Sequence, residues 1–336
     1  MSSLTFLLPG LRGPFPGLPE DVVPELPSLE TFLAKARKRH TGYHTFYQHL
    51  CGLFGLEQKP GRDLPVAALS RLVDDTERPE GIWMRADPVH LKPGLNDLTL
   101  IDTAFIPFSQ HDAILLGTPL QEIFTGLGWT LEIPIAQRWY LRLDQDLAIE
   151  TVEIGEVRGR DVQQLMPTGR DRPKLDQLMT EVQMLLHRNQ YNLDREQDGF
   201  LPLNSLWFWG CGTLPDSLNS RWSKIVSDDP VAHGLGVVTG TPIVSFYEGT
   251  EEFMSEPDVR PDILVVKDDL QVKTGYQDFT AWQETMYELE EKWFTPALTA
   301  LREGDLKRVA IISDGMEYAS TGWSLKKFWC RRRGVL

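Results

Sequence analysis

The 336-residue sequence has few cysteines, no long apolar run and no excess of positive charge. Its three cysteines, Cys51, Cys211 and Cys330, are odd in number and far apart, which argues against a disulfide framework. No segment approaches the roughly 18 apolar residues that a transmembrane helix needs. The N-terminus also lacks the basic and apolar stretches of a secretory signal. These absences predict a reduced, cytoplasmic protein.

The charge balance excludes a further set of partners. Lys and Arg number 34 and Asp and Glu number 48, so the net charge is −14. Nucleic acids and anionic membranes must be neutralised by Lys and Arg, and we therefore expect neither as a partner. A hydrophobic content of 41% with 24% charged residues is typical of a globular protein.

The pattern of apolar runs predicts an α/β fold. Three short, continuous apolar runs, Leu4–Leu8, Asp262–Val266 and Arg308–Ile312, are typical of buried parallel strands. Further strands are expected over Ile82–Ile106, 129–133, 139–143 and 203–209, and helices over 28–39, 45–54, 64–73, 175–186 and 229–238. We expect a central, largely parallel sheet flanked by helices, with Arg308–Ile312 as its last strand.

One late helix has a clear start and a clear break. Asp278 is a good N-cap, and Trp282, Met286, Leu289 and Trp293 follow at spacings that place them on one buried face. The later Pro296 should kink or interrupt this helix, because proline lacks the amide hydrogen that the helix requires.

The polar loop at 167–173 is the best candidate for a domain boundary. It predicts an N-terminal α+β portion, residues 1–166, that contributes a strand to the core of a C-terminal α/β portion, residues 167–336. One continuous globular unit is the alternative.

Two apparent motifs fail when their spacing is examined. His40, His44 and His49 would need to share one face to bind zinc, and Gly42 interrupts the helix that would align them, which favours separate polar roles. The Gly210–Gly212 segment follows an apolar strand as a phosphate-binding turn does. Pro215 nevertheless occupies the position of the third glycine, so nucleotide binding is disfavoured.

Two clusters could carry chemistry. Asp87 and His90, with Arg85 nearby, are expected just before a strand, and α/β enzymes place catalytic groups at strand ends. A turn cap and a backbone-bonded histidine are the structural alternative. Asp268, Asp269 and Asp314 follow the last two apolar strands and could bind Mg²⁺, Mn²⁺ or Zn²⁺, although capping of the next turn explains each of them singly.

Several segments resemble a known family. ADPVHL (86–91) and NSLWFWG (204–210), with RWYLRL (138–143) and DILVVKDDL (262–270), resemble the RpfE-type regulatory proteins of bacteria. That group is similar to the ApgM-like, cofactor-independent phosphoglycerate mutases of the alkaline phosphatase superfamily. The resemblance implies an alkaline-phosphatase-like core with an additional N-terminal portion.

The sequence departs from the mutase pattern at the positions that bind metal. The resemblance implies an Asp after the first strand, where this chain has Pro9. It implies a Gly-His pair where Gly275 and Tyr276 stand, and an Asp-His pair where Asp314 and Gly315 stand. A two-metal site depends on its full ligand set, so these departures predict a degenerate site.

The resemblance therefore implies a diverged, noncatalytic relative of the mutases with a regulatory or binding role. Its partner would be an unknown protein or a small phosphorylated ligand, and no cofactor is expected. The alternative is a phosphomutase or phosphatase with a rearranged Mn or Zn site drawn from Asp87, His90, Asp268, Asp269 and Asp314. A structural role through aromatic surface, suggested only by 10 tryptophans, is less favoured because most of these should be core.

Overall fold

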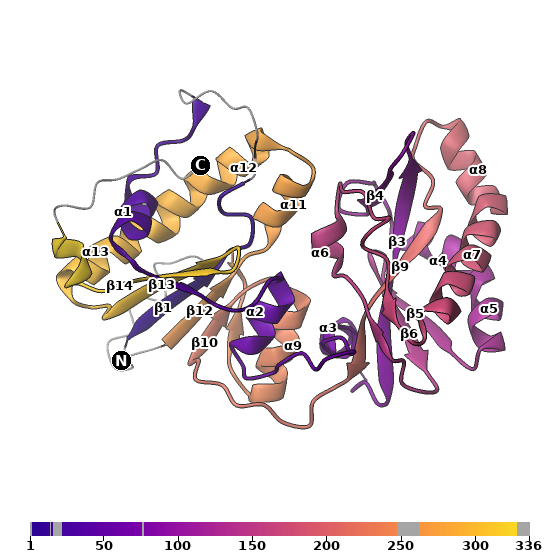
Figure 1. The fold of residues 1–336 in the computed structure, drawn as a ribbon, viewed down its shortest axis with the longest axis horizontal. Coiled ribbons are helices and arrows are strands. Elements are labelled where there is room, and N and C mark those ends of the chain that lie inside the picture. Colours follow the sequence, from indigo (N-terminus) through magenta and orange to yellow (C-terminus); the bar gives the residue numbers. More distant parts are fainter. Residues whose placement is uncertain (1, 14, 16–21, 76, 247–261, 328–336) are drawn as a thin grey trace. The chain divides into compact units, whose positions relative to one another are not determined.

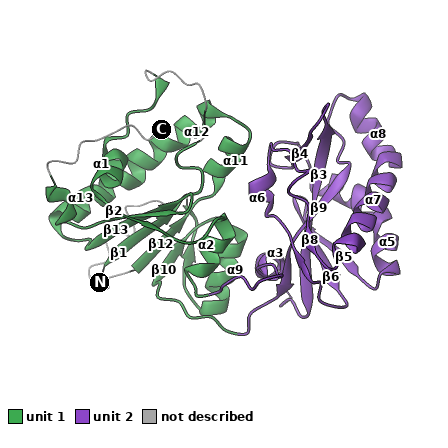
Figure 2. Cartoon of the chain, viewed as in Figure 1, with its two compact units in different colours: residues 1–55, 217–336 green, residues 56–216 purple. Residues whose placement is uncertain are grey.

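A computed structural model describes residues 2–13, 15, 22–75, 77–246 and 262–327. The chain forms two compact units, one from Met1–Gly55 with Ser217–Leu336 and the other from Leu56–Asp216 (Figure 2). Cys330 lies outside the described residues. In the part of the chain that is described, no helix combines the length and the apolar character needed to cross a membrane.

A seven-stranded sheet organises the first unit (Figure 1). From one edge to the other, the strands are β11 (Ile243–Val244), β10 (Lys224–Val226), β12 (Asp262–Val266), β1 (Ser3–Leu7), β13 (Arg308–Ser313), β14 (Met316–Ser320) and β2 (Arg37–His40). The first five are parallel, and β14 and β2 run antiparallel to their neighbours. The prediction that three buried strands share a largely parallel sheet is confirmed, because β1 lies between β12 and β13.

Helices cover both faces of this sheet (Figure 1). One face carries α1 (Pro27–Lys35), α12 (Phe279–Leu289), a π-helical turn (Glu290–Phe294) and α13 (Thr295–Glu303), while α2 (Phe46–Gly52) and α9 (Pro230–Thr239) lie on the other. The short α11 (Asp269–Gly275) follows β12, and a 3₁₀ turn (Ser324–Lys326) follows β14. The main core forms on the first face, where Phe6 packs edge-on against Trp293 at 6.0 Å between ring centroids.

The late helix begins as predicted, and a π-helical turn interrupts its α-helical hydrogen bonding just before Pro296. The Asp278 carboxylate accepts a hydrogen bond from the Ala281 amide at 3.0 Å. Trp282, Met286, Leu289 and Trp293 are buried, as their spacing predicts. The break precedes Pro296, since the chain passes through the π-helical turn before α13 starts with the proline in its first turn. In the π-helical turn the Thr295 amide donates to the Glu290 carbonyl, and the next residue, Pro296, has no amide hydrogen to donate.

Two expectations for this unit are wrong. The helix expected over 28–39 ends at Lys35, because 37–40 instead pairs with β14 as an edge strand. Arg308–Ile312 is also not in the last strand, since β14 returns from it through a two-residue turn. Asp314 and Gly315 form that turn with φ values of +48° and +79°, the geometry that an Asp-Gly hairpin requires.

An antiparallel sheet organises the second unit. Its order is β4 (Leu98–Asp102), β3 (Ile82–Pro93), β6 (Arg138–Leu143) and β5 (Thr130–Ile135), with β9 (Ser205–Thr213) paired to the other side of β3. A minor sheet joins β7 (Ile149–Glu150) to β8 (Thr168–Gly169). Pro88 lacks an amide hydrogen, yet β3 loses no ladder bond through it. It lies between the part of β3 that pairs with β6 and the part that pairs with β4, so no neighbouring strand would accept a bond there.

Helices cover both faces of this second sheet too. The short α3 (Val66–Asp74) packs on one face against Trp83 and Tyr140. The other face carries α4 (Gln110–Gly117), a 3₁₀ turn (Thr118–Leu120), α5 (Gln121–Gly126), α7 (Arg172–Arg188) and α8 (Gln190–Gln197), and α6 (Ile154–Val157) precedes β8 in the chain. Tyr140 is fully buried, because α3 covers it.

The division into units differs from the boundary expected at 167–173. That loop lies inside the second unit. The elements that follow it in the chain belong to the same unit, since β9 pairs with β3 and α7 packs against β9. The chain leaves this unit only after Asp216. Strand pairing between distant segments sets the boundary, and a polar loop does not reveal such pairing.

Candidate functional site

The carboxyl ends of the parallel strands gather acidic residues at one edge of the first unit's sheet. Strands β1, β10, β12 and β13 run in the same direction, so the residues that follow them share one edge. Asp229 follows β10, Asp268 and Asp269 follow β12, and Asp314 follows β13, whereas Leu8 and Pro9 follow β1. Ligand sites of open α/β sheets lie at this edge.

Asp229 is the most deeply buried of these carboxylates. One oxygen caps α9 by accepting from the Ala232 amide at 2.8 Å, and the other accepts from the Tyr47 hydroxyl at 3.1 Å. Burial, followed by repulsion from the nearby Asp268 carboxylate, raises the pKa of Asp229 to about 7. A carboxyl group in this state can hold or release a proton near neutral pH.

Sequence reasoning missed both Asp229 and Tyr47. The Asp-Pro pair at 229–230 after a short strand signals a helix N-cap, and this signal could have identified Asp229. Nothing in the sequence places Tyr47 beside it, because the two are 182 residues apart.

Asp268 and Asp269 lie next to lysines at the start of α11. The Asp269 carboxylate contacts the ammonium groups of Lys267 at 3.1 Å and Lys273 at 2.9 Å. Its other oxygen is buried and has no hydrogen-bond partner among the described residues. Two cations already balance this carboxylate.

Asp314 is exposed in the β13–β14 turn and points its oxygens at the protein. It accepts from the Gly10 amide at 3.1 Å and from the Ser313 hydroxyl at 2.7 Å. These bonds connect the segment after β1 to the end of β13, so the Asp314 carboxylate stabilises the local backbone.

His49 is the one buried member of the histidine cluster, since His40 and His44 are exposed. Its Nδ1 lies 2.7 Å from the Thr45 carbonyl and its Nε2 lies 2.8 Å from the Thr41 hydroxyl. Burial lowers its pKa, although the Thr45 carbonyl and the Asp314 charge oppose this shift. Among the described residues, no group of three or more His, Cys, Asp or Glu side chains is arranged to hold a metal ion.

Asp87 and His90 belong to the second unit and lie in the middle of β3, not before a strand as expected. The Arg85 guanidinium contacts both oxygens of Asp87, at 2.9 and 2.8 Å, and the Trp209 indole donates to the same carboxylate at 2.8 Å. The His90 imidazole bonds to the Pro202 carbonyl at 2.7 Å, the backbone bond that the structural alternative anticipates. Alternation along the strand puts Arg85 and Asp87 on one buried face, which explains their pairing.

The glycine-rich segment is explained by close packing. Gly210 has a φ of +67°, and a side-chain carbon there would lie 3.0 Å from Val66 at the start of α3. A side-chain carbon at Gly212 would lie 2.8 Å from Pro65. Cys211 between them is buried, and burial raises the pKa of its thiol, so it is an inert core residue.

The α/β fold of this chain, with its central and largely parallel sheet, is found in solved structures. The PH0037 protein from Pyrococcus horikoshii matches with a TM-score of 0.50 at 11% identity, covering 95% of this chain and 87% of that one. The cofactor-independent phosphoglycerate mutase from Thermoplasma acidophilum gives a TM-score of 0.43 at 16% identity, with 96% and 90% coverage. The likeness to the first of these shows a shared fold.

The sequence is weakly similar to mutases of the same kind. The 2,3-bisphosphoglycerate-independent phosphoglycerate mutase of Methanosarcina mazei is 24% identical over 100 residues, which are 28% of this chain and 25% of that protein. A probable enzyme of the same name from Geobacter sulfurreducens is 26% identical over 94 residues, 26% of this chain and 24% of its own length. The matches thus span about a quarter of these relatives, and no model of a known protein family matches the sequence.

Proposed function

We propose that this chain is a diverged, noncatalytic relative of the cofactor-independent phosphoglycerate mutases, with a regulatory or binding role like that of the RpfE-type proteins. The observation that carries the proposal is that the carboxylates at the carboxyl edge of the sheet bond to other groups of the protein. Asp229 caps α9, Asp269 is paired with lysines, and Asp314 ties β13 to Gly10. Each of these carboxylates is thus bonded to groups of the protein itself.

The donor set does not fit a two-metal centre. The segment after β1 offers Pro9, whose side chain has no donor atom. Lysine ammonium groups lie where a cation would contact Asp269, and Lys is not a usual ligand for such ions. A proton rather than a metal ion can neutralise Asp229, whose pKa burial and then Asp268 raise to about 7. We therefore derive no catalytic step through metal ions.

A second candidate is a metal-dependent phosphomutase or phosphatase with a rearranged site. The unpartnered Asp269 oxygen and the repulsion between Asp229 and Asp268 favour it, because an added cation would relieve both. Asp87 and His90 are poor members of such a site, since Arg85 and the Pro202 carbonyl already bind them.

Metal titration separates the two candidates. Thermal melts of the full chain with increasing Mn²⁺ or Zn²⁺ should show no saturable rise in melting temperature, because a ligand stabilises only the state that binds it. Turnover of 3-phosphoglycerate or p-nitrophenyl phosphate should stay at background. Bound metal, measured on purified protein, should be far below one equivalent.

The control variants keep this test specific. A saturable rise that Asp314→Asn abolishes, and that Asp198→Asn on the exposed end of α8 leaves intact, would establish the second candidate and overturn the first. If metal binds nonspecifically, both variants should show the same rise in melting temperature as the original chain, and the first candidate stands.

A further inference from the structure

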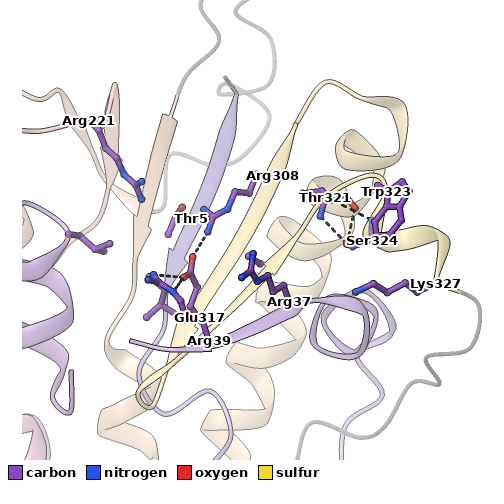
Figure 3. A pocket seen from close by; sticks show the side chains of 13 residues that line it. Thr5, Arg37, Arg39, Arg221, Arg308, Glu317, Thr321, Trp323, Ser324 and Lys327 are labelled. Atoms are coloured by element: carbon purple, nitrogen blue, oxygen red, sulfur yellow. Dashed lines mark hydrogen bonds and ion pairs between the residues drawn. The ribbon is translucent and has the colours of Figure 1, made fainter. Parts of the chain in front are cut away.

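A cavity of about 680 Å³ opens on the face of the first unit's sheet that lies opposite the main core. It is lined by side chains from β1, β13, β14, β2 and the segment after β14 (Figure 3). This volume lies within the usual range for small-molecule sites. The carboxyl-edge aspartates are not part of its lining.

The register of four strands creates the floor of this cavity. One row of paired residues crosses the sheet from Thr5 through Ala310 and Ala319 to Arg37. Residues in such a row project from the same face of the sheet. Because two alanines stand in the middle of the row, the space between Thr5 and Arg37 has no large side chain over it.

The cavity concentrates positive charge on an acidic protein. Its cationic lining residues are Arg37, Arg39, Arg221, Arg308 and Lys327, against the single carboxylate of Glu317. The whole chain has a net charge of −14. Clustered cations repel each other unless an anion lies between them, so this arrangement is unusual for a surface without a ligand.

Glu317 does not neutralise the cluster. It accepts from Arg39 at 2.9 and 2.7 Å and also pairs with Arg308. Burial opposes ionisation, but the hydrogen bonds and charges of these two arginines outweigh it and lower the pKa of Glu317. A guanidinium has five N–H donors, so both arginines keep donors for a further acceptor. No ion pair or side-chain hydrogen bond of Arg37 occurs among the described residues.

The Thr5 hydroxyl is the second observation that points to a ligand. Thr5 is 1% exposed, lines the cavity, and its oxygen has no hydrogen-bond partner among the described residues. A buried hydroxyl without a partner is destabilising, and native proteins rarely keep one. An oxygen-rich ligand in the cavity would satisfy it.

We propose that this cavity binds a small anion carrying two or more phosphate groups, held by Arg37, Arg39 and Arg308 over the Thr5 hydroxyl. Arginine forks match phosphate oxygens in geometry and charge. An extended polyanion such as a nucleic acid would meet the negative field of the rest of the protein, which favours an anion small enough to be enclosed. Trp323 at the rim is 74% exposed and offers a flat surface for a planar ring, as in a nucleotide.

Calorimetry on the full chain with inorganic pyrophosphate, ADP and adenosine tests the proposal. Pyrophosphate and ADP should bind, adenosine should not, and added salt should weaken binding. Tighter binding of ADP than of pyrophosphate, lost in Trp323→Ala, would identify a nucleotide. Equal binding would identify the phosphates alone as the recognised group. Failure of both anions to bind at millimolar concentration would overturn the proposal.

Two variants test whether the anion binds in this cavity. Arg37→Gln should weaken binding roughly tenfold or more, because it removes a charge-assisted contact. Thr5→Val should weaken it roughly fivefold without lowering the melting temperature of the free protein, since it removes a hydroxyl that lacks a partner. Arg302→Gln, an exposed position on α13, is the matched control and should bind as the original chain does. Unchanged binding in both cavity variants would contradict the proposal.

This inference does not depend on the proposed function. Turnover of 3-phosphoglycerate that Asp314→Asn abolishes and Arg37→Gln spares would locate a catalytic site at the carboxyl edge. It would overturn the noncatalytic proposal and leave the pyrophosphate result unaffected.

Discussion

Each unit of the molecule buries an aspartate, and the two are stabilised in different ways. Asp87 of the second unit is paired with Arg85, two residues away on the same strand. Asp229 of the first unit relies on the start of α9 and on Tyr47, and Asp268 adds repulsion. Burial raises the pKa of both carboxyl groups, and only in the second unit does an arginine counter that shift directly.

The difference separates a structural charge from a functional candidate. The Asp87 carboxylate accepts from Arg85, Trp209 and the Trp139 amide, so no oxygen is left for a substrate. Asp229 lies at the edge of the sheet where α/β folds bind ligands, and strongly shifted carboxyl groups in such positions are candidates for function. The carboxyl edge of the first unit is therefore the better candidate site.

The largest effect is expected from breaking the buried ion pair. Arg85→Leu leaves the Asp87 charge without a partner in the core of the second unit, and should cost about 3–5 kcal/mol of unfolding free energy. Urea unfolding, followed by tryptophan fluorescence, measures the loss. The double variant Arg85→Leu/Asp87→Leu should recover most of it, because no unpaired charge remains. A single-variant cost below about 1 kcal/mol would mean that water reaches Asp87.

The unfolding free energy of Asp229→Asn, measured over a range of pH, tests the buried aspartate of the first unit. The pKa of Asp229 rises from 3.8 to about 7 on folding, so the native state holds the proton more tightly than the unfolded state. Its contribution to stability is complete below about pH 4 and is lost as the pH rises towards 7. The variant should therefore gain stability relative to the original chain over this interval, on the order of 1–3 kcal/mol. A difference that does not vary with pH would contradict the shift.

The smallest effect is expected at an exposed cap. Asp278 caps α12 with a bond of 3.0 Å to the Ala281 amide, as Asp229 caps α9, but it lies at the surface. Asp278→Ala should cost about 1 kcal/mol, the usual value of a lost N-cap. Chemical denaturation of the full chain measures it. A cost as large as that of Arg85→Leu would contradict this prediction, because an exposed cap should contribute far less than a buried ion pair.

Much of the fold could be predicted from local patterns. The runs at 4–8, 262–266 and 308–312 are strands because continuous apolar character requires cover on both faces, and the sheet provides it. The helix after Asp278 was equally clear, since cap and periodicity agreed. The edge strand at 37–40 was missed, because its four polar residues have no strand pattern without β14 beside them.

The candidate site could be predicted only in part. Strand ends identified Asp268, Asp269 and Asp314, because parallel strands place their carboxyl ends together. The roles of these residues depended on neighbours from elsewhere in the chain. The Asp-Gly signal at 314–315 was also present in the sequence and indicated a hairpin turn, which accounts for Asp314 without a metal ion.

By itself, the sequence determined the class of fold, the buried strands and helices, and the acidic character of the sheet edge, because these follow from periodicity and composition within short segments. Only the tertiary structure decided that 56–216 forms its own unit, that Tyr47 meets Asp229, and that Thr5 and Arg37 share one row of the sheet. These facts depend on which strands pair and in what register. Pairing is set by the packing of the whole sheet, and no local pattern encodes it.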